Sequence, residues 1–206
     1  VALLISTLAL RLRSVANDSV ERERRTASLS RLSSALARSR SKLDLAESAK
    51  REIQASFDGE AAVLFRTDGR LEPIAPSSSN FESDPNEAAV ASWSAANALV
   101  AGKDTDTLGS AEALYLPLIG GQGTVGVLAF RPGPLGWPLA PAQRSLLETF
   151  ANTLGLALER AQLAKDSHEA RLEAESERLR NALLSSIAHD LRTPLTSISG
   201  AASALV

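Results

Sequence analysis

His189 is the residue whose type and setting most clearly suggest chemistry. The stretch LLSSIAHDLRTPLTSISG, residues 183–200, carries this histidine with Asp190 directly after it and Pro194 five residues on. The same stretch predicts a helix with one apolar stripe, because its large aliphatic residues recur every three or four positions: Leu184, Ile187, Leu191, Leu195 and Ile198. At about 100° per residue, His189 lies roughly 160° from its stripe neighbours and points away from the packed side. An exposed histidine is usually a plain surface residue. A neutral imidazole on an accessible face can also act as a nucleophile.

The composition disfavours several other kinds of function, namely nucleic-acid binding, disulfide bonding and metal binding. The chain has 206 residues, a net charge of −2 and 44% hydrophobic residues, which suits a folded protein of one or two small domains. It has no bulk basic charge, so the sequence does not indicate a nucleic-acid partner. It also has no cysteine and only two histidines, far apart, which disfavours disulfides and thiolate or histidine metal sites.

The N-terminal residues 1–13 form a short apolar run, VALLISTLALRLR. The chain starts with Val and contains no Met, so we expect a piece of a longer protein. The run is too short to cross a bilayer, which takes about 20 residues. It is either the start of a buried helix or a truncated last transmembrane helix. Five arginines lie at its end or beyond it, as expected on the cytoplasmic side of a membrane: Arg11, Arg13, Arg22, Arg24 and Arg25.

The middle of the chain has a helical pattern first, and then two strand-rich stretches with a helix between them. Residues 14–57 lack Gly and Pro and predict a connecting helix, broken at most once. Residues 60–74 and 113–130 each read as two short strands joined by a glycine-containing turn. Between them, residues 87–102 predict a helix that follows Asp84-Pro85 and ends at Gly102. The expected fold class is therefore α+β, with a small antiparallel sheet and covering helices over residues 58–160.

From Pro141 onward the pattern is helical. Residues 161–180 predict an exposed or coiled-coil helix, since Arg171 and Glu175 lie four apart and Glu177 and Arg180 lie three apart. Residues 181–206 carry the histidine segment. Pro194 lacks a backbone donor and predicts a bend in that helix just beyond His189.

The block SSIAHDLRTPLTSISG resembles the phosphoacceptor motif of sensor histidine kinases, in their dimerisation and phosphotransfer (HisKA) domain. The segments AGKDTDTLGSAEALYLPL and RSLLETFANTLGLALERAQL are similar to the potassium-responsive Kdp branch of that family. In that branch, membrane helices precede a GAF-like domain that leads into the histidine helix. The resemblance thus implies a GAF-like domain over 58–160, a signalling helix over 161–180 and the start of a HisKA domain over 181–206.

The resemblance also implies roles for the residues of this motif. His189 would accept the phosphoryl group, and Asp190 would hydrogen-bond its other ring nitrogen. Thr193 would orient a water that hydrolyses the phosphorylated response regulator, unless it is a solvent-facing helix threonine. Pro194 would act as a hinge between kinase and phosphatase geometries.

The whole protein implied by the resemblance is a membrane-bound, homodimeric kinase of a two-component system. ATP and Mg²⁺ would be bound by a catalytic domain that this stretch does not contain, so the chain by itself would be inactive. The partners would be a second copy and a response regulator, with this portion in the cytoplasm at the inner membrane. Potassium limitation or osmotic stress would be the input, and the arginine cluster would either sense ionic or lipid conditions or serve topology alone.

Two alternatives to phosphotransfer stay open at this point. The α+β unit is either a small-molecule sensor or a transmission scaffold, and Trp93, Tyr115 and Trp137 either line a pocket or fill a core. The chain could also be a purely structural dimer, for which the His189-Asp190 pair would have no use.

Overall fold

The computed structural model describes residues 22–67, 69–75, 81, 84–133 and 136–203, and of residues 186 and 188–203 it describes the backbone alone. The chain divides into two compact units, one ending at Ala161 and the other beginning at Gln162. The predicted membrane-helix stub of residues 1–13 lies outside the described residues, as do Arg11 and Arg13. Within the described part, no helix combines the length and apolar character needed to cross a membrane.

The first unit is built on an antiparallel sheet of five strands in the order β2-β1-β5-β4-β3. The strands are β1 (Gly59–Thr67), β2 (Arg70–Pro73), β3 (Ala101–Gly102), β4 (Leu114–Gly120) and β5 (Gly123–Pro132). Both hairpins expected from the sequence are present, since β1 pairs with β2 and β4 pairs with β5. The sheet also pairs β1 with β5, which brings two segments far apart in the chain side by side. The α+β class is confirmed.

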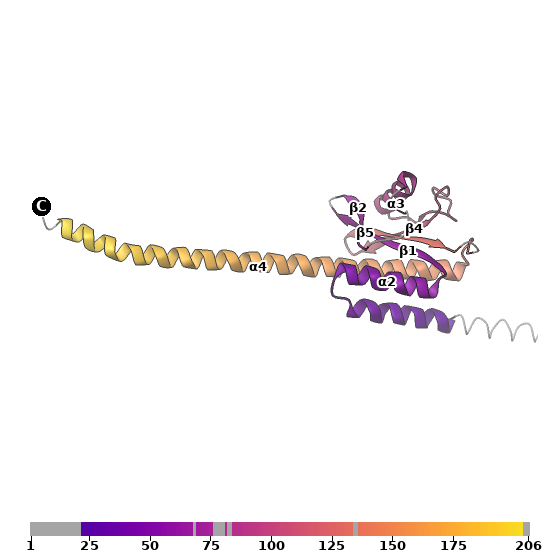
Figure 1. The fold of residues 1–206 in the computed structure, drawn as a ribbon, viewed down its shortest axis with the longest axis horizontal. Helices are drawn as coiled ribbons and strands as arrows, with labels where there is room; N and C mark the ends of the chain where they lie inside the picture. Colours follow the sequence, from indigo (N-terminus) through magenta and orange to yellow (C-terminus); the bar gives the residue numbers. More distant parts are fainter. Residues whose placement is uncertain (1–21, 68, 76–80, 82–83, 134–135, 204–206) are drawn as a thin grey trace, which may run out of the picture. The chain divides into compact units, whose positions relative to one another are not determined.

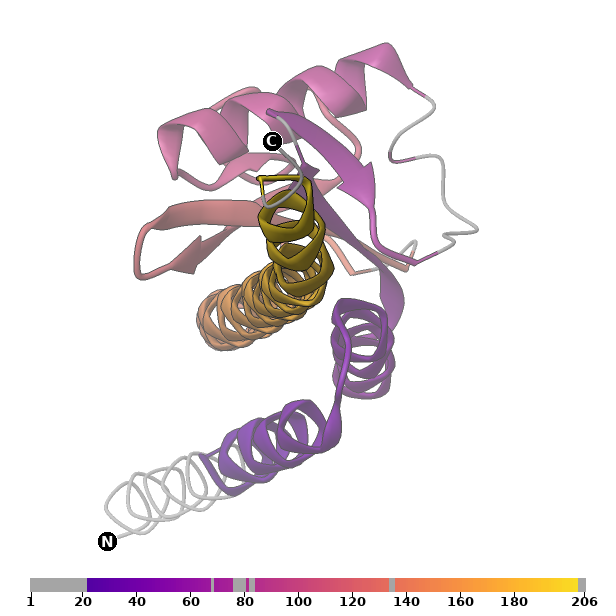
Figure 2. The ribbon, with the colours of Figure 1, turned by 90° about the vertical axis from the view of Figure 1, so that its left-hand side faces the viewer.

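Helices cover both faces of this sheet (Figures 1 and 2). On one face lies α3 (Pro85–Asn97). On the other lie α2 (Lys42–Ser56) and the first part of α4 (Pro141–Ser203), next to a helix over residues 22–38. The break between residues 38 and 42 is the single interruption within the described part of the connecting segment, residues 22–56. Because both faces are covered, β1 shows a continuous buried run rather than a half-buried alternation.

The two faces have different cores. The face under α2 and α4 packs leucines and phenylalanines, with Ala61 and Val63 supplied by β1. The face under α3 is richer in alanine, with Ala62 and Leu64 supplied by the same strand. Successive strand residues therefore serve opposite cores, as the period of two requires. Small side chains on the α3 side let that helix lie close to the sheet.

The starts of α2 and α3 follow the capping rules. Ser41 and Asp44 form a capping box at α2, and Asp84 accepts a hydrogen bond from Asn86 N at the start of α3.

The end of α3 differs from the sequence prediction. We predicted that α3 runs to Gly102, which is wrong. The helix ends at Asn97, Ala98 adopts a left-handed φ of 53°, and Gly102 lies in β3. Edge pairing with β4 takes these residues out of the helix.

Beyond Ala161, the second unit is helical up to Ser203. Among the side chains described in this stretch, Lys165 and Glu169 form an ion pair, with Nζ and Oε1 3.6 Å apart. The two pairs predicted from spacing, Arg171–Glu175 and Glu177–Arg180, are not formed among the described side chains. All four residues are exposed, where such a pair stabilises little.

Candidate functional site

The histidine segment lies in the helical part of the second unit. The backbone is helical at His189, Asp190, Thr193 and Pro194. Their side chains lie outside the described residues, so their roles stay predictions. The predicted helix is therefore present, and the predicted orientation of His189 is not tested.

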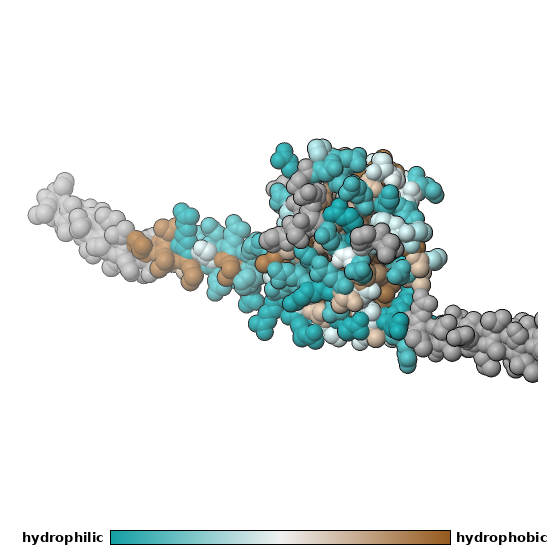
Figure 3. All heavy atoms as spheres, turned by 45° about the vertical axis from the view of Figure 1, so that its right-hand side comes forward, coloured by the Kyte–Doolittle hydropathy of each residue, from teal (hydrophilic) through white to brown (hydrophobic). Residues whose placement is uncertain are grey.

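Apolar side chains are exposed just before this segment. Leu184 and Ile187, the first two members of the predicted stripe, are 57% and 54% exposed, and Leu183 is 65% exposed. Figure 3 shows the apolar surface gathering on the helix of this unit. A cluster of this kind is typical of a surface that another helix covers.

A buried acid–phenol pair lies in the first unit between α3 and the sheet. Glu87 is 5% exposed and Tyr115 is fully buried. The Tyr115 hydroxyl donates to Glu87 Oε2 at 2.5 Å, and the backbone N–H of Glu112 donates to Glu87 Oε1 at 2.8 Å. Burial, and then the hydrogen bond to Glu87, raise the pKa of Tyr115. Both carboxylate oxygens thus have protein partners.

Sequence reasoning missed this pair. Glu87 stands three residues after Asp84, where an acid is usually read as a helix-start residue that faces solvent. The only sequence signal is that Glu87 comes three residues before Val90 and four before Ala91, on the face that turns out to be buried. Ser94, on the same face, donates from its hydroxyl to Leu99 O at 2.7 Å.

Arg131 contacts three side chains near the buried Glu87–Tyr115 pair: Glu60, Glu112 and Phe81. Its guanidinium lies 3.0 Å from Glu60 Oε2 and 3.1 Å from Glu112 Oε2, and its carbon is 5.0 Å from the centre of the Phe81 ring. The hydrogen bond to Glu60 is the main cause that raises the pKa of Arg131. This cation is therefore already engaged on two sides and over a ring, as a structural clamp would be.

The three aromatic residues considered as a pocket lining do not lie together. Tyr115 and Trp93 belong to the core under α3, whereas Trp137 packs against the core on the opposite face. Of the two alternatives, a joint pocket is contradicted, because the sheet separates these side chains. Their role as core residues is supported.

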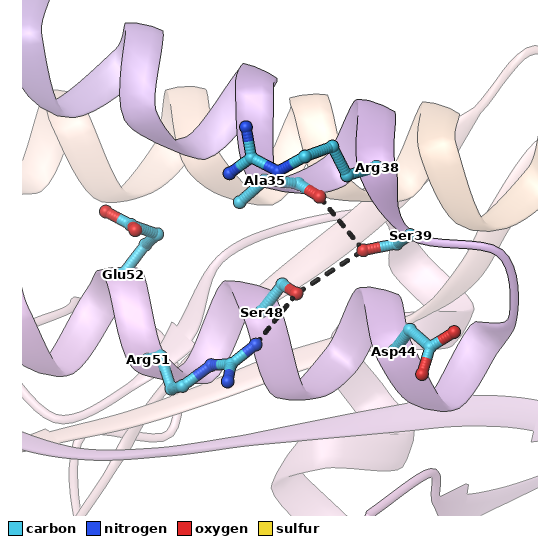
Figure 4. Close-up of a pocket in the computed structure, with 7 residues that line it drawn as sticks. All are labelled: Ala35, Arg38, Ser39, Asp44, Ser48, Arg51 and Glu52. Carbon is cyan, nitrogen blue, oxygen red and sulfur yellow. Dashed lines mark hydrogen bonds between the residues drawn. The ribbon is translucent and has the colours of Figure 1, made fainter.

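An open cavity of about 470 Å³ lies between the helix over residues 22–38 and α2 (Figure 4). Its lining comprises Ala35, Arg38, Ser39, Asp44, Ser48, Arg51 and Glu52. Arg51 donates to Ser48 Oγ at 3.3 Å, and Ser39 donates to Ala35 O at 3.0 Å. The two hydroxyl oxygens are 3.3 Å apart, so these hydroxyls bond within the hairpin.

The charges of this cavity do not favour a ligand of either sign. Arg38 and Arg51 are matched by two carboxylates, Asp44 and Glu52. Asp44 accepts from the backbone N–H of Ser41 at 3.1 Å. Hydrogen bonding with the Ser41 side chain, and then with the Arg40 backbone, lowers the pKa of Asp44. In the part of the chain that the structure describes, no three or more His, Asp or Glu side chains cluster in a way that could hold a metal.

The β4–β5 turn is held by a carboxylate from α4. Glu159 Oε2 accepts from Gly121 N at 2.6 Å, and Oε1 accepts from Gln122 N at 2.9 Å. These two bonds lower the pKa of Glu159. Leu158, the preceding residue, is fully buried in the core under α4. The contact therefore lies where α4 is still packed on the sheet, two residues before the unit ends at Ala161.

Comparison with known protein families identifies both parts of the chain. A family model for the GAF domain matches residues 22–160, and one for the His Kinase A (phospho-acceptor) domain matches residues 179–206. The GAF match includes the helical hairpin of residues 22–56, in line with its packing on the sheet.

Two curated relatives carry the same name. "Sensor protein KdpD" of Escherichia coli (strain K12) is 39% identical over 206 residues, which is 100% of this chain and 23% of that protein. "Sensor protein KdpD" of Clostridium acetobutylicum is 37% identical over 121 residues, which is 59% of this chain and 13% of that protein. The chain thus spans less than a quarter of the length of these relatives.

Solved structures agree with these matches. The crystal structure of the native GAF domain of the potassium sensor histidine kinase KdpD from Escherichia coli superposes with a TM-score of 0.60 and 34% identity, covering 69% of this chain and 98% of that one. A GAF domain from an Acinetobacter phosphoenolpyruvate-protein phosphotransferase has a TM-score of 0.52 and 13% identity, covering 69% of this chain and 97% of that one, so it shows the fold alone. The chain therefore belongs to the Kdp-type sensor histidine kinases, of which it carries a GAF domain and a His Kinase A segment.

Proposed function

We propose that the full-length protein is a sensor histidine kinase that phosphorylates itself on His189. The observation that carries this proposal is the HDLRTP motif inside the segment that matches the phospho-acceptor family. An imidazole nitrogen of His189 attacks the γ-phosphorus of ATP, a P–N bond forms, and the P–O bond to ADP breaks. The phosphoryl group then passes to an aspartate of a response regulator, and the histidine is restored.

The neighbouring residues would support this chemistry. Asp190 accepts a hydrogen bond from the other ring nitrogen of His189, which fixes the tautomer that attacks and balances the charge that develops. Thr193, one turn further on, positions a water for hydrolysis of the phosphorylated regulator. Pro194 lets the helix bend between these two tasks. A catalytic domain outside this sequence would hold ATP and Mg²⁺.

The similarity to the relatives supports proposals for the oligomeric state, the location, the input and the output of the full-length protein. We propose that the protein is a homodimer, that residues 1–13 end its last membrane helix, and that the rest of this chain is cytoplasmic. The E. coli relative's GAF domain is described as part of a potassium sensor. We therefore propose potassium limitation or osmotic stress as the input and potassium-transport genes as the output.

The first test is labelling of the full-length protein in membrane vesicles with γ-labelled ATP. We expect an acid-labile, base-stable label that His189→Gln abolishes. The matched control is His168→Gln, because His168 is the only other histidine and lies exposed on the same helix α4. Label that persists in His189→Gln, or that depends on His168, would refute the assignment.

For the GAF domain we propose a transmission role rather than ligand sensing. The buried polar side chains under α3 have partners within the protein: Glu87 accepts from the Tyr115 hydroxyl and from Glu112 N, and the Ser94 hydroxyl donates to Leu99 O. A core satisfied in this way leaves no buried donor or acceptor for a ligand at these residues. A thermal-shift screen with nucleotides and salts tests this role, and a specific, saturable rise in Tm would refute it.

A further inference from the structure

The contact between Glu159 and the β4–β5 turn joins the sheet to the helix that carries the phosphoacceptor motif. Glu159 and His189 both lie on α4, 30 positions apart. The carboxylate accepts from two successive backbone N–H groups, Gly121 and Gln122, at 2.6 and 2.9 Å. A two-oxygen, two-donor contact with a charged acceptor is strong and directional, so it fixes rotation of the helix as well as its distance from the turn.

Two glycines make this contact possible. A Cβ at Gly120 would lie 2.7 Å from Glu159 Cδ, so the Glu159 carboxylate would have to shift from its present position at the turn. A Cβ at Gly155 would lie 2.7 Å from both Ile119 N and Ile119 O. The turn and the helix thus approach each other at backbone distance, one helical turn apart along α4. Any displacement of the turn must therefore be shared by the helix.

Strand β4, which leads into the turn, has an irregularity in its pairing with β5. The pairing of β4 with β5 shifts register between Leu118 and Ile119, immediately before the turn and opposite Gly155. An irregularity of this kind bends a strand locally and interrupts its ladder. The hairpin end beyond this irregularity, Ile119↔Thr124 and Gly120↔Gly123, is the part that contacts α4.

Other polar contacts of α4 lie in its first turns, among them the Arg25 guanidinium, which donates to Ser145 Oγ at 3.0 Å. Arg144 donates to Asp104 O at 2.7 Å and lies 3.8 Å from Asp104 Oδ2. It holds the helix to the loop before β4, fifteen residues before Glu159. Glu159 is the anchor next to the end of the packed unit at Ala161, where the helix leaves the sheet.

We infer that Glu159 is a positioning residue, whose contact with Gly121 N and Gln122 N passes movements of the β4–β5 turn to α4 and so sets the ratio of kinase to phosphatase activity. This inference rests on the proposed function, because it concerns the same His189. It adds a residue and a contact that the phosphotransfer chemistry does not itself require.

The test compares Glu159→Gln with Glu169→Gln in full-length protein in vesicles. An amide keeps the shape of Glu159 but turns an NH₂ group toward one of the two N–H donors, so the paired contact is lost. Glu169 is the matched control, since its described ion pair is with Lys165 on the same helix. The readouts are the initial rate of His189 labelling, the rate of regulator dephosphorylation, and Tm.

We expect Glu159→Gln to change the ratio of the two rates by about fivefold or more, the lower end of typical coupling between sites, with the control unchanged. A purely structural role would lower Tm and both rates together and leave their ratio at the control value, which would overturn the inference. If His189→Gln keeps its label in the same vesicles, the proposed function fails instead. If His189 is labelled normally and the ratio does not move, only the role of Glu159 fails.

Discussion

Tyr115 shows how one buried side chain can report on the whole α3 face. It is the single tyrosine of the chain, so its ionisation can be followed without interference from another phenol. Burial first, and then the hydrogen bond to Glu87, raise its pKa above the ordinary value of about 10. Because the folded pKa lies above the unfolded one, this effect stabilises the fold below about pH 10 and is lost as the pH rises further. We expect phenolate absorbance to appear only together with loss of helical circular dichroism. Phenolate that forms near pH 10 in a fully helical protein would contradict this.

Removing the Tyr115 hydroxyl tests the same pair from the other side. Tyr115→Phe leaves Glu87 Oε2 buried without this donor, so we expect the free energy of unfolding to fall by about 1–3 kcal/mol. Ser92→Ala is the control, since Ser92 is an exposed residue of α3, and its effect should stay within about 0.5 kcal/mol. Denaturant titration measures both. Equal effects of the two variants would mean that the pair contributes nothing.

At the scale of elements, the crossing of α4 over β4 depends on a glycine. Alanine normally stabilises a helix interior relative to glycine by about 1 kcal/mol. At Gly155, however, a Cβ would lie 2.7 Å from the Ile119 backbone, so α4 would have to move away from the strand. We expect Gly155→Ala to destabilise the fold by about 1–3 kcal/mol. Asn152→Ala, at an exposed position of the same helix, should be neutral or slightly stabilising. Thermal unfolding of both variants decides, and a stabilised Gly155→Ala variant would refute the close crossing.

At the scale of the whole molecule, the exposed apolar side chains near the histidine segment predict self-association. Leu184 and Ile187 are more than half exposed in the single chain. We expect the double variant Leu184→Asp, Ile187→Asp to raise the dimer dissociation constant at least about tenfold, because each carboxylate would have to be desolvated in the interface. Ser185→Asp adds one charge on the same stretch and should leave association unchanged. Analytical ultracentrifugation over a range of concentrations measures the constants. An unchanged double variant would locate the dimer contact elsewhere.

The local sequence pattern was enough to predict the two hairpins, the start of α4 and the family. The glycine turns of residues 60–74 and 113–130 predicted both hairpins, because a tight turn between two apolar runs has few other solutions. Pro141 marked the start of α4 for a similar reason. The motif around His189 indicated the family directly, since its chemistry requires those residue types in that order.

Tertiary structure decided what pattern could not. The end of α3 at Asn97 depends on edge pairing of Ala101 and Gly102 with β4, which no local signal in the sequence reveals. The inward turn of Glu87 depends on Tyr115 lying 28 positions away, and the Glu159 contact depends on a turn 37 and 38 positions away. Hydrogen-bond partners at such separations are chosen by how the sheet and helices pack together, whereas capping and turn preferences act over a few neighbouring residues. The sequence therefore determined the elements and the chemistry of the motif, and only the packed fold determined which side chains join them.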